Sequence, residues 1–391
     1  MNGWPVFADD EIEAAARVLR SGNVNYWTGD EGQAFEREFA AATGSRHAVA
    51  VANGTLALDL ALAALALPAA SEVVVTPRTF VASVSSIVRA GLTPVCADVD
   101  PDSGNITPSS ISAVLTPRTR AILCVHLGGW PCEMPAIMDL ARSRDRKQRQ
   151  DLKVIEDCAQ AHGARIEGRS VGSFGDIGAW SFCQDKIIST GGEGGMLTTD
   201  DDVLYETMWS AKDHGKQRVR ARTPPAEATS FRWLHDGLGT NARMTEPQAA
   251  IGRLQLRKLA AWQARREEIA QAVLAACAGH PWLQVPRPDN RMQHAWYRAY
   301  VRLDLARMPA GWDRDRLMFA LQAAGVPCNA GSCSEVYREA AFTGMPLAAR
   351  RLPNAALLTD SALAFLVHPT LDATDVADIT AALRRTLANI A

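Results

Sequence analysis

Short apolar runs alternate with amphipathic stretches from residue 47 onward, and this alternation constrains the fold more than any other feature of the sequence. The runs have the composition of strands buried on both faces, and the stretches between them carry apolar residues at helical spacing. Repeated strand-helix-strand units form a mainly parallel sheet with helices on both faces. The predicted strands, seven in all, are His47–Ala52, Glu72–Thr76, Pro94–Asp98, Ala121–His126, Lys153–Glu156, Gly178–Cys183 and Gly195–Thr199. The clearest helices between them are predicted at Thr55–Leu67, Val81–Ala90 and Pro135–Arg144.

The sequence pattern changes after Thr245 and indicates a second structural unit. A helical run extends from Glu246 to about Cys277, and a proline-rich joint follows between residues 281 and 288. Beyond the joint the sequence predicts a strand at Tyr297–Leu305, a helix at Asp313–Ala324 and a C-terminal helix from about Ala373.

A length of 391 residues fits two domains. We expect an α/β protein with a large domain over residues 1–255, which holds the seven-stranded, mainly parallel sheet, and a smaller C-terminal α+β domain over residues 256–391. The N-terminal segment is a candidate to pack on the small domain.

Composition and charge exclude several classes of protein. With 47% apolar and 21% charged residues, the chain has the balance of a globular protein and not of a disordered one. A formal net charge of -2 and the lack of a large basic patch argue against nucleic acid as a partner. The 8 cysteines are scattered through a long chain, which indicates thiols in a reducing compartment. No apolar run reaches the length of a membrane span and Met1–Asp10 has no signal-peptide pattern, so we expect a cytoplasmic protein without membrane insertion.

One lysine, Lys186, stands in a polar loop between two predicted strands. The glycine-rich segment Gly191–Gly195 follows it and lets the backbone turn sharply into the next strand. A lysine beside a buried pocket is kept nucleophilic by desolvation, which suits Schiff-base chemistry. Taken alone, a loop lysine is more often an ordinary surface residue, so this interpretation depends on other features.

Asp157 ends a predicted buried strand in the run Val154–Gly163. The carboxyl ends of parallel strands are where open α/β sheets bind ligands. A carboxylate there can hold a heterocyclic nitrogen protonated, as pyridoxal phosphate requires if its ring is to act as an electron sink. The alternative is an aspartate that caps the following turn.

A phosphate-binding turn is the third candidate feature. Gly54 and Thr55 start a predicted helix directly after a strand, where backbone N–H groups and a threonine hydroxyl can bind a phosphate. Ser181 and Asn241 can each add a hydrogen bond. A plain capped helix explains the same residues.

Phe80 starts the helix that follows another strand, where it can stack on an aromatic cofactor; a core phenylalanine is the default alternative. Two other kinds of site have weaker support. The glycines of Gly172–Gly178 do not match the spacing of a dinucleotide-binding fingerprint and do not open a helix. Cys124, His126 and Cys132 lack a second pair of ligands at zinc spacing, so we predict no metal.

The set of motifs, in this order, resembles the sugar aminotransferase family called DegT/DnrJ/EryC1/StrS, within the fold-type I pyridoxal phosphate enzymes. The resemblance covers nearly the whole chain. The matching segments are Tyr26–Gly29 with Phe35 and Glu36, Asn53–Thr55, Thr79–Ala82, Thr116–Thr119, Glu156–Asp157, Gly172–Asp176, Ser181–Phe182, Lys186, Gly192–Gly195, Asp213–Gly215, Asn241–Met244 and Gln248–Gly252.

The resemblance implies pyridoxal 5'-phosphate as the cofactor and assigns roles to the matching residues. Lys186 would bind the cofactor covalently, and Asp157 would pair with the pyridine nitrogen. Gln160 would lie near the ring hydroxyl and Phe80 would stack on the ring. Phosphate contacts would come from Gly54, Thr55, Ser181 and, from the neighbouring subunit, Asn241. The family therefore implies a homodimer with shared active sites.

Three departures from the family pattern stand out. Asn53 occupies a position where serine is frequent, and Gln184 and Asp185 precede the lysine where Pro-Thr or similar is common. We expect the change at residues 184 and 185 not to affect the chemistry. The segment Gly331–Tyr337 stands near where many relatives have a histidine-containing substrate segment.

The resemblance predicts an aminotransferase that moves an amino group from L-glutamate to a nucleotide-linked keto-sugar. The expected acceptor is a UDP-linked 4-keto-6-deoxy hexose, as in the synthesis of bacillosamine-type sugars for surface glycans such as lipopolysaccharide. A keto-cyclitol or a 3-keto sugar is the alternative, and a non-catalytic protein of the same fold is a further one. Candidate substrate contacts are Tyr26, Trp27, Thr28 and Arg243, and Arg243 is equally suited to a structural ion pair.

Overall fold

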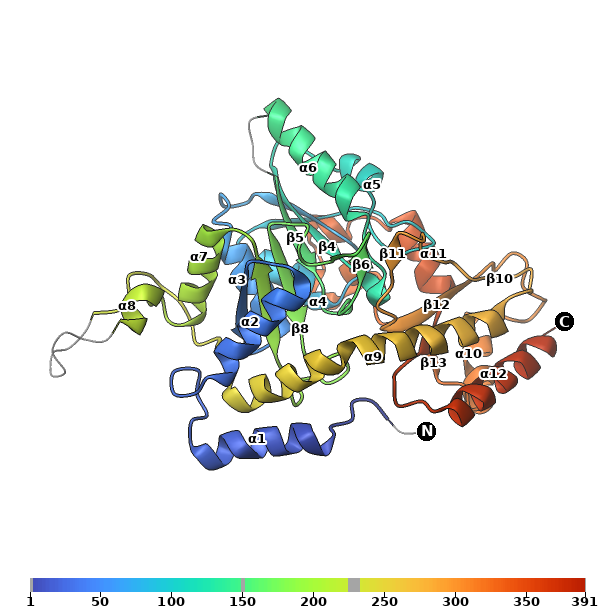
Figure 1. The fold of residues 1–391 in the computed structure, drawn as a ribbon. Helices are drawn as coiled ribbons and strands as arrows, with labels where there is room; N and C mark the ends of the chain where they lie inside the picture. Colours follow the sequence, from blue (N-terminus) through green and yellow to red (C-terminus); the bar gives the residue numbers. More distant parts are fainter. Residues whose placement is uncertain (1–2, 149–151, 224–232, 391) are drawn as a thin grey trace.

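The central sheet consists of the seven strands that the sequence predicts (Figure 1). The computed structural model describes residues 3–148, 152–223 and 233–390. In space the strands follow the order β1-β9-β8-β5-β4-β2-β3. Neighbours from β8 to β3 run parallel, whereas β9 is antiparallel to both β1 and β8. Their bounds are β1 His47–Val51, β2 Glu72–Val75, β3 Thr93–Cys96, β4 Thr119–Val125, β5 Lys153–Asp157, β8 Ile177–Ser181 and β9 Gly195–Thr199.

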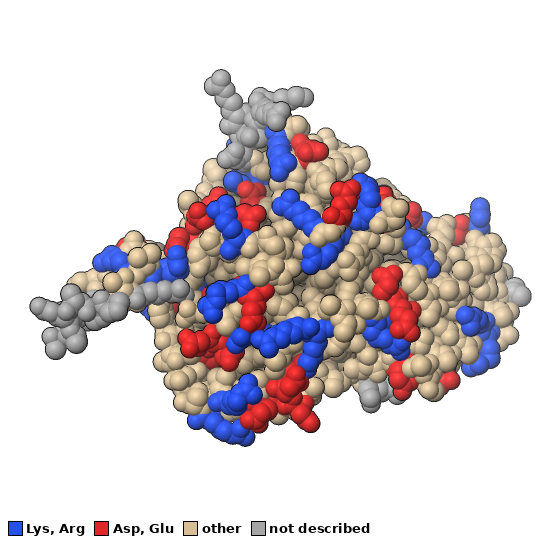
Figure 2. All heavy atoms as spheres, in the orientation of Figure 1, with Lys and Arg blue, Asp and Glu red and all other residues tan. Residues whose placement is uncertain are grey.

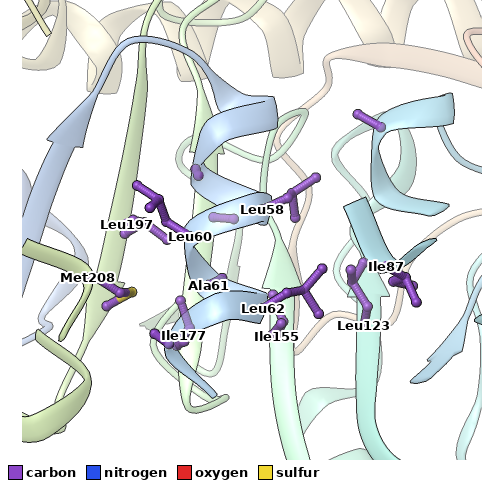
Figure 3. Packing of buried hydrophobic residues seen from close by; sticks show 14 of the residues in the cluster. Leu58, Leu60, Ala61, Leu62, Ile87, Leu123, Ile155, Ile177, Leu197 and Met208 are labelled. Carbon is purple, nitrogen blue, oxygen red and sulfur yellow. The ribbon is translucent and has the colours of Figure 1, made fainter. Parts of the chain in front are cut away.

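Helices cover both faces of this sheet because its strands are apolar on both sides. In β2, Val73 and Val75 belong to the core beneath α3 and α4, while Val74 between them faces the core beneath α6. Figure 3 shows the first of these cores, where Leu58 and Leu62 of α3 pack over the sheet. The covering helices are α2 Glu31–Thr43, α3 Gly54–Ala64, α4 Val81–Arg89, α5 Pro108–Ser112, α6 Met134–Gln148, α7 Asp202–Lys212 and the first half of α9 Glu246–Cys277.

The helix α9 connects the central sheet to a second, four-stranded sheet. Its 32 residues extend for about 48 Å, from contacts with α1 and α2 at one end to β12 and α12 at the other. The predicted domain boundary between residues 255 and 256 lies within this continuous helix. A second, antiparallel sheet has the order β10-β12-β14-β13. The remaining helices and the strands of this sheet are α1 Asp9–Ser21, α8 Arg218–Arg222, α10 Arg314–Ala323, α11 Pro353–Ser361, α12 Ala373–Ala388, β10 Leu283–Gln284, β12 Arg298–Leu303, β13 Cys328–Asn329 and β14 Ala362–Leu366.

Two small elements complete the fold. A three-stranded ribbon, in the order β11-β6-β7, joins the two parts of the chain, because β11 Met292–Gln293 pairs with β6 Arg165–Ile166 and the latter with β7 Arg169–Ser170. Single-turn 3-10 helices span Leu127–Gly129, Val336–Arg338, Ala340–Phe342 and Pro346–Ala348.

The surface carries both signs of charge. On the face drawn in Figure 2, acidic and basic side chains are interspersed. Ion pairs of the described residues include Arg253 with Glu31 and Glu38, each at 2.6 Å. Within the described residues, no helix combines the length and the apolar character needed to cross a bilayer.

Glu156 anchors the end of β5 from inside the protein. Its side chain is fully buried, and its two oxygens accept the backbone N–H groups of Gly172, Phe174 and Gly175 at 2.7–2.9 Å. His126 at the end of β4 lies 3.1 Å away through Nε2, and its Nδ1 accepts the N–H of Cys132. Because Nδ1 accepts this N–H, the ring hydrogen lies on Nε2, which donates to Glu156.

We predict that Glu156→Gln destabilises the protein by about 3 kcal/mol or more, because an amide NH2 replaces an acceptor that faces several buried donors. The exposed Glu339→Gln is the control and is expected to stay within about 0.5 kcal/mol of wild type. Urea denaturation monitored by circular dichroism measures both. Equal unfolding midpoints for the two variants would contradict the anchoring role.

Candidate active site

The carboxyl ends of β1, β2, β5 and β8 meet at one edge of the central sheet, since these strands all point the same way. A cavity of about 850 Å³ opens at this edge. It is lined by most of the residues for which the sequence predicts a cofactor role: Gly54, Thr55, Phe80, Asp157, Gln160, Ser181 and Lys186. Residues from distant parts of the sequence are thus brought to one site by strand topology.

The start of α3 forms a polar cradle on one side of the cavity. Asn53 caps the helix through its side-chain oxygen, which accepts the N–H of Leu56 at 2.9 Å. The N–H groups of Gly54 and Thr55 precede the first helical hydrogen bonds and remain available to an anion. A Cβ on Gly54 would lie 2.6 Å from the Cβ of Ser181, so only glycine lets the helix start approach the end of β8 this closely.

Asp157 presents a buried carboxylate to the cavity, with 7% of its surface exposed. The hydroxyl of Ser83 donates to it at 2.8 Å, and the N–H of Ala159 donates at 3.1 Å. Burial raises the pKa of Asp157 above its ordinary value of 3.8, although these two hydrogen bonds oppose the shift. Ser83 is not among the predicted site residues. It lies three residues after Phe80, the N-cap of α4, and this spacing places both at the first helical turn beside the cavity.

Lys186 lies in the loop after β8, and its side chain is 16% exposed. Its Nζ is 3.1 Å from the Asp185 carboxylate and 5.2 Å from the centre of the Tyr297 ring, and the Tyr297 hydroxyl donates to Asp185. Burial alone raises the pKa of Asp185, but the Lys186 ammonium and the Tyr297 hydroxyl outweigh it and hold that pKa below its ordinary value. Gln184 and Asp185 both line the cavity. Asp185, which belongs to this departure from the family pattern, thus pairs directly with Lys186. That the departure leaves the chemistry unaffected stays a prediction.

Gln160 and the loop after β13 close another side of the cavity. The Gln160 Oε1 accepts the N–H of Gly128 at 2.7 Å, and the hydroxyl of Ser332 approaches it at 3.5 Å. Ser332 and Cys333 line the cavity directly, within the segment that departs from the family pattern. Phe80 remains 65% exposed at the cavity mouth, so it is not a core phenylalanine.

Three other candidates gather outside the cavity lining, around the buried carboxylate of Asp213. The indole N–H of Trp27 donates to its Oδ2 at 2.6 Å, and Arg243 and Lys216 donate to its Oδ1. Asn241 pairs with Asp213 through a backbone bridge, and its side chain is exposed. Within this chain, Arg243 has the structural ion pair that was one of its two proposed roles.

Tyr26 and Thr28 also lie outside the cavity lining. Tyr26 is 1% exposed, and its hydroxyl donates to Glu36 at 2.9 Å and accepts from the Trp209 indole at 3.2 Å. Thr28 is exposed, with its hydroxyl directed to the carbonyl of Asn25. This conformation leaves Tyr26 no surface with which to contact a substrate, because its ring and hydroxyl are part of the core.

A compact set of possible metal ligands lies beneath the cavity. The donor atoms of His126, Glu156 and Cys158 lie within 4.8 Å of one another, and all three residues are buried. The hydrogen bonds of His126 and Glu156 described above already account for this arrangement as a structural anchor. Cys124 and Cys132, the other residues considered as ligands, are buried in the core next to it.

Comparison with known proteins agrees with this geometry. The sequence pattern described as the DegT/DnrJ/EryC1/StrS aminotransferase family matches residues 5–384. The chain belongs to this family. It is therefore an aminotransferase of the pyridoxal phosphate-dependent class with the fold-type I architecture, as the sequence motifs predict.

Several relatives of this aminotransferase are named for sugar substrates. The chain is 35% identical, over 97% of its length and 94% of the relative's, to a UDP-N-acetyl-3-dehydro-alpha-D-glucosamine 3-aminotransferase of Acidithiobacillus ferrooxidans. It is 34% identical, over 93% of its length and 88% of the relative's, to a dTDP-3-amino-3,4,6-trideoxy-alpha-D-glucose transaminase of Streptomyces venezuelae. Among solved structures, an aminotransferase from Psychrobacter cryohalolentis superposes with a TM-score of 0.95 at 51% identity, and the match covers 100% of this chain and 99% of that one.

We predict that Asp157→Asn raises the unfolding temperature of the protein without added ligands by about 2 °C at pH 8. The raised pKa of Asp157 means that its ionised form disfavours folding, so the cost is fully present above the folded pKa and disappears as the pH falls toward 3.8. The gain from Asp157→Asn should shrink accordingly as the pH is lowered.

Thermal unfolding between pH 8 and about pH 4, which covers the window above the ordinary pKa, measures this difference, with the exposed Asp378→Asn as the control. A variant that is less stable than wild type at pH 8, or a gap that widens in acid, would contradict the prediction.

Proposed function

We propose that this aminotransferase binds pyridoxal 5'-phosphate and transfers the amino group of L-glutamate to a nucleotide-linked keto-sugar. The observation that carries the proposal is the convergence of Lys186, Asp157 and the start of α3 on one cavity. These are the amine, the carboxylate and the anion cradle that such a cofactor needs.

The residues of the cavity fit the cofactor. Because Gly54 has no Cβ, the start of α3 lies directly beside the hydroxyl of Ser181, and the two together can bind a phosphate. The hydrogen-bond donors of Asp157 are neutral, so a protonated ring nitrogen would supply the missing positive charge. When bound, pyridoxal phosphate joins reversibly to amines and its ring takes up the electrons released when a C–H bond of the substrate breaks.

Lys186 is the residue suited to move the proton in that reaction. Its Nζ lies in the cavity, and Asp185 with Tyr297 holds it within reach of a ligand bound between Asp157 and α3. A free lysine amine accepts a proton from the substrate carbon and can return it to another carbon held nearby.

The proposal includes a homodimer whose two copies share each active site. Asn241 and Trp27 are exposed and lie outside the cavity of their own chain. A second copy placed against this surface would bring Asn241 to the phosphate cradle and leave Arg243 near the cavity mouth of its neighbour. The proposal therefore accounts for candidate residues that this chain does not bring to its own cavity.

For the acceptor we propose a UDP-linked 4-keto-6-deoxy hexose, used in the cytoplasm for surface-glycan sugars. This choice rests on the resemblance of the motifs. A UDP-linked 3-keto hexose is the second candidate, because two of the relatives are named for amination at position 3.

A spectroscopic titration tests the function. We expect pyridoxal phosphate to give an absorption band above 400 nm (roughly the range of lysine-bound cofactor), L-glutamate to bleach it, and the correct keto-sugar to restore it. UDP-4-keto-6-deoxy-GlcNAc and UDP-3-keto-GlcNAc are compared as acceptors. Recovery of the absorption band with the 3-keto sugar alone would overturn the 4-keto assignment, while the assignment as an aminotransferase would stand.

A second experiment tests the lysine. Substantial transamination by the Lys186→Ala variant would reject the role of Lys186.

We predict that Gly54→Ala weakens the binding of pyridoxal phosphate by about 10- to 100-fold, because the added methyl group is forced against Ser181. Gly237→Ala is the matched control, since a Cβ there meets nothing within 4 Å. Fluorescence titration of the cofactor measures both. Equal affinities for the two variants would place the phosphate elsewhere.

A further inference from the structure

Trp4, close to the N-terminus, makes a direct hydrogen bond to the main chain of Lys186. Its indole Nε1 donates to the Lys186 carbonyl oxygen at 2.7 Å, across 182 positions of sequence. Trp4 precedes α1, and Figure 1 draws the N-terminal segment below α9. Trp4 is half-buried in this position.

Two residues of α9 hold the Trp4 ring in place. Trp262 meets it edge to face, with ring centroids 5.1 Å apart, and the Arg266 guanidinium lies 5.2 Å from its ring centre. Arg266 is itself buried and donates to the carbonyl oxygens of Trp296 and Val367 in the second part of the chain. Burial lowers the pKa of Arg266 to about 9, so the guanidinium stays charged at neutral pH. The Arg266 guanidinium and the Trp262 ring therefore hold the Trp4 indole in place.

The backbone and the side chain of Lys186 are held by neighbouring residues. Tyr297 directs its hydroxyl to Asp185, next to the lysine, while the adjacent Trp296 accepts the hydrogen bond of Arg266 beneath Trp4. Within the part of the chain that the structure describes, the Lys186 main chain makes one further hydrogen bond, in a local turn where its N–H donates to the carbonyl of Cys183 at 3.0 Å. Among the described residues, Trp4 thus supplies the long-range support of this peptide.

We propose that Trp4 is a positioning residue for Lys186: its indole N–H fixes the lysine backbone so that Nζ stays directed into the cavity. The inference rests on the proposed role of Lys186 as the cofactor-binding lysine. The N-terminal segment then contributes to catalysis without touching substrate or cofactor.

The variant Trp4→Phe tests this, because it keeps an aromatic ring against Trp262 and Arg266 and removes the N–H. In the protein without cofactor, we expect faster hydrogen exchange of the backbone amides between residues 183 and 190, measured by mass spectrometry. In the protein with cofactor, we expect kcat to fall about tenfold, while KM for L-glutamate stays within about twofold, since no substrate contact is lost.

Trp233→Phe is the matched control, because it makes the same chemical change at an indole that is 79% exposed. Trp4→Ala is the second variant and should show a larger effect on exchange over the same residues, with thermal unfolding used to confirm that both variants fold. The proposal would be overturned if Trp4→Phe showed the same hydrogen exchange over residues 183–190 and the same kcat as Trp233→Phe. Failure of the proposed function would be recognised separately, as transamination surviving in Lys186→Ala.

Discussion

The buried carboxylate of Glu156 is the interaction on which the geometry of the site depends. It joins the end of β5 to His126 at the end of β4 and to the turn 172–175 that leads into β8. Because side chains alternate along a strand, the next residue, Asp157, faces the opposite side and enters the cavity. Glu156, with both carboxylate oxygens hydrogen-bonded, thereby fixes the separation of the neighbouring strand ends from which Asp157 and Ser181 project.

The sequence allows the central sheet and most of the cofactor site to be predicted because both are encoded by local signals. A run of apolar residues defines each buried strand, and a polar residue directly after the run lies at the carboxyl edge. Asp157 and Ser181 end their strands, Gly54 begins the helix after another, and the structure places all three on one cavity. The parallel arrangement of the strands then brings these ends together at one edge of the sheet.

Contacts between distant segments escape this kind of reasoning. Asp185 meets Tyr297 across 112 positions, and Trp4 meets Lys186 across 182, with no periodicity to connect the partners. The strand β14 also went unpredicted, because its five apolar residues follow α11 directly and are equally typical of a continuing helix. In the proposed homodimer, the roles of Asn241 and Arg243 would depend on the second copy, whose position one chain does not define.

The end of β5 carries two neighbouring carboxylates with different roles: Glu156 supports the structure, and Asp157 faces the cavity. Glu156 has four hydrogen-bonding partners and is fully buried, so its charge is satisfied by the protein alone. Asp157 has the hydroxyl of Ser83 and one N–H, both neutral, and its pKa is raised by burial. A carboxylate in this state gains most from a cationic partner that arrives from the cavity, because the Coulomb attraction is strong where water is excluded. In the proposed function, the destabilising burial of Asp157 would thus favour the binding of a protonated ring, and removing the charge would stabilise the fold while weakening that binding.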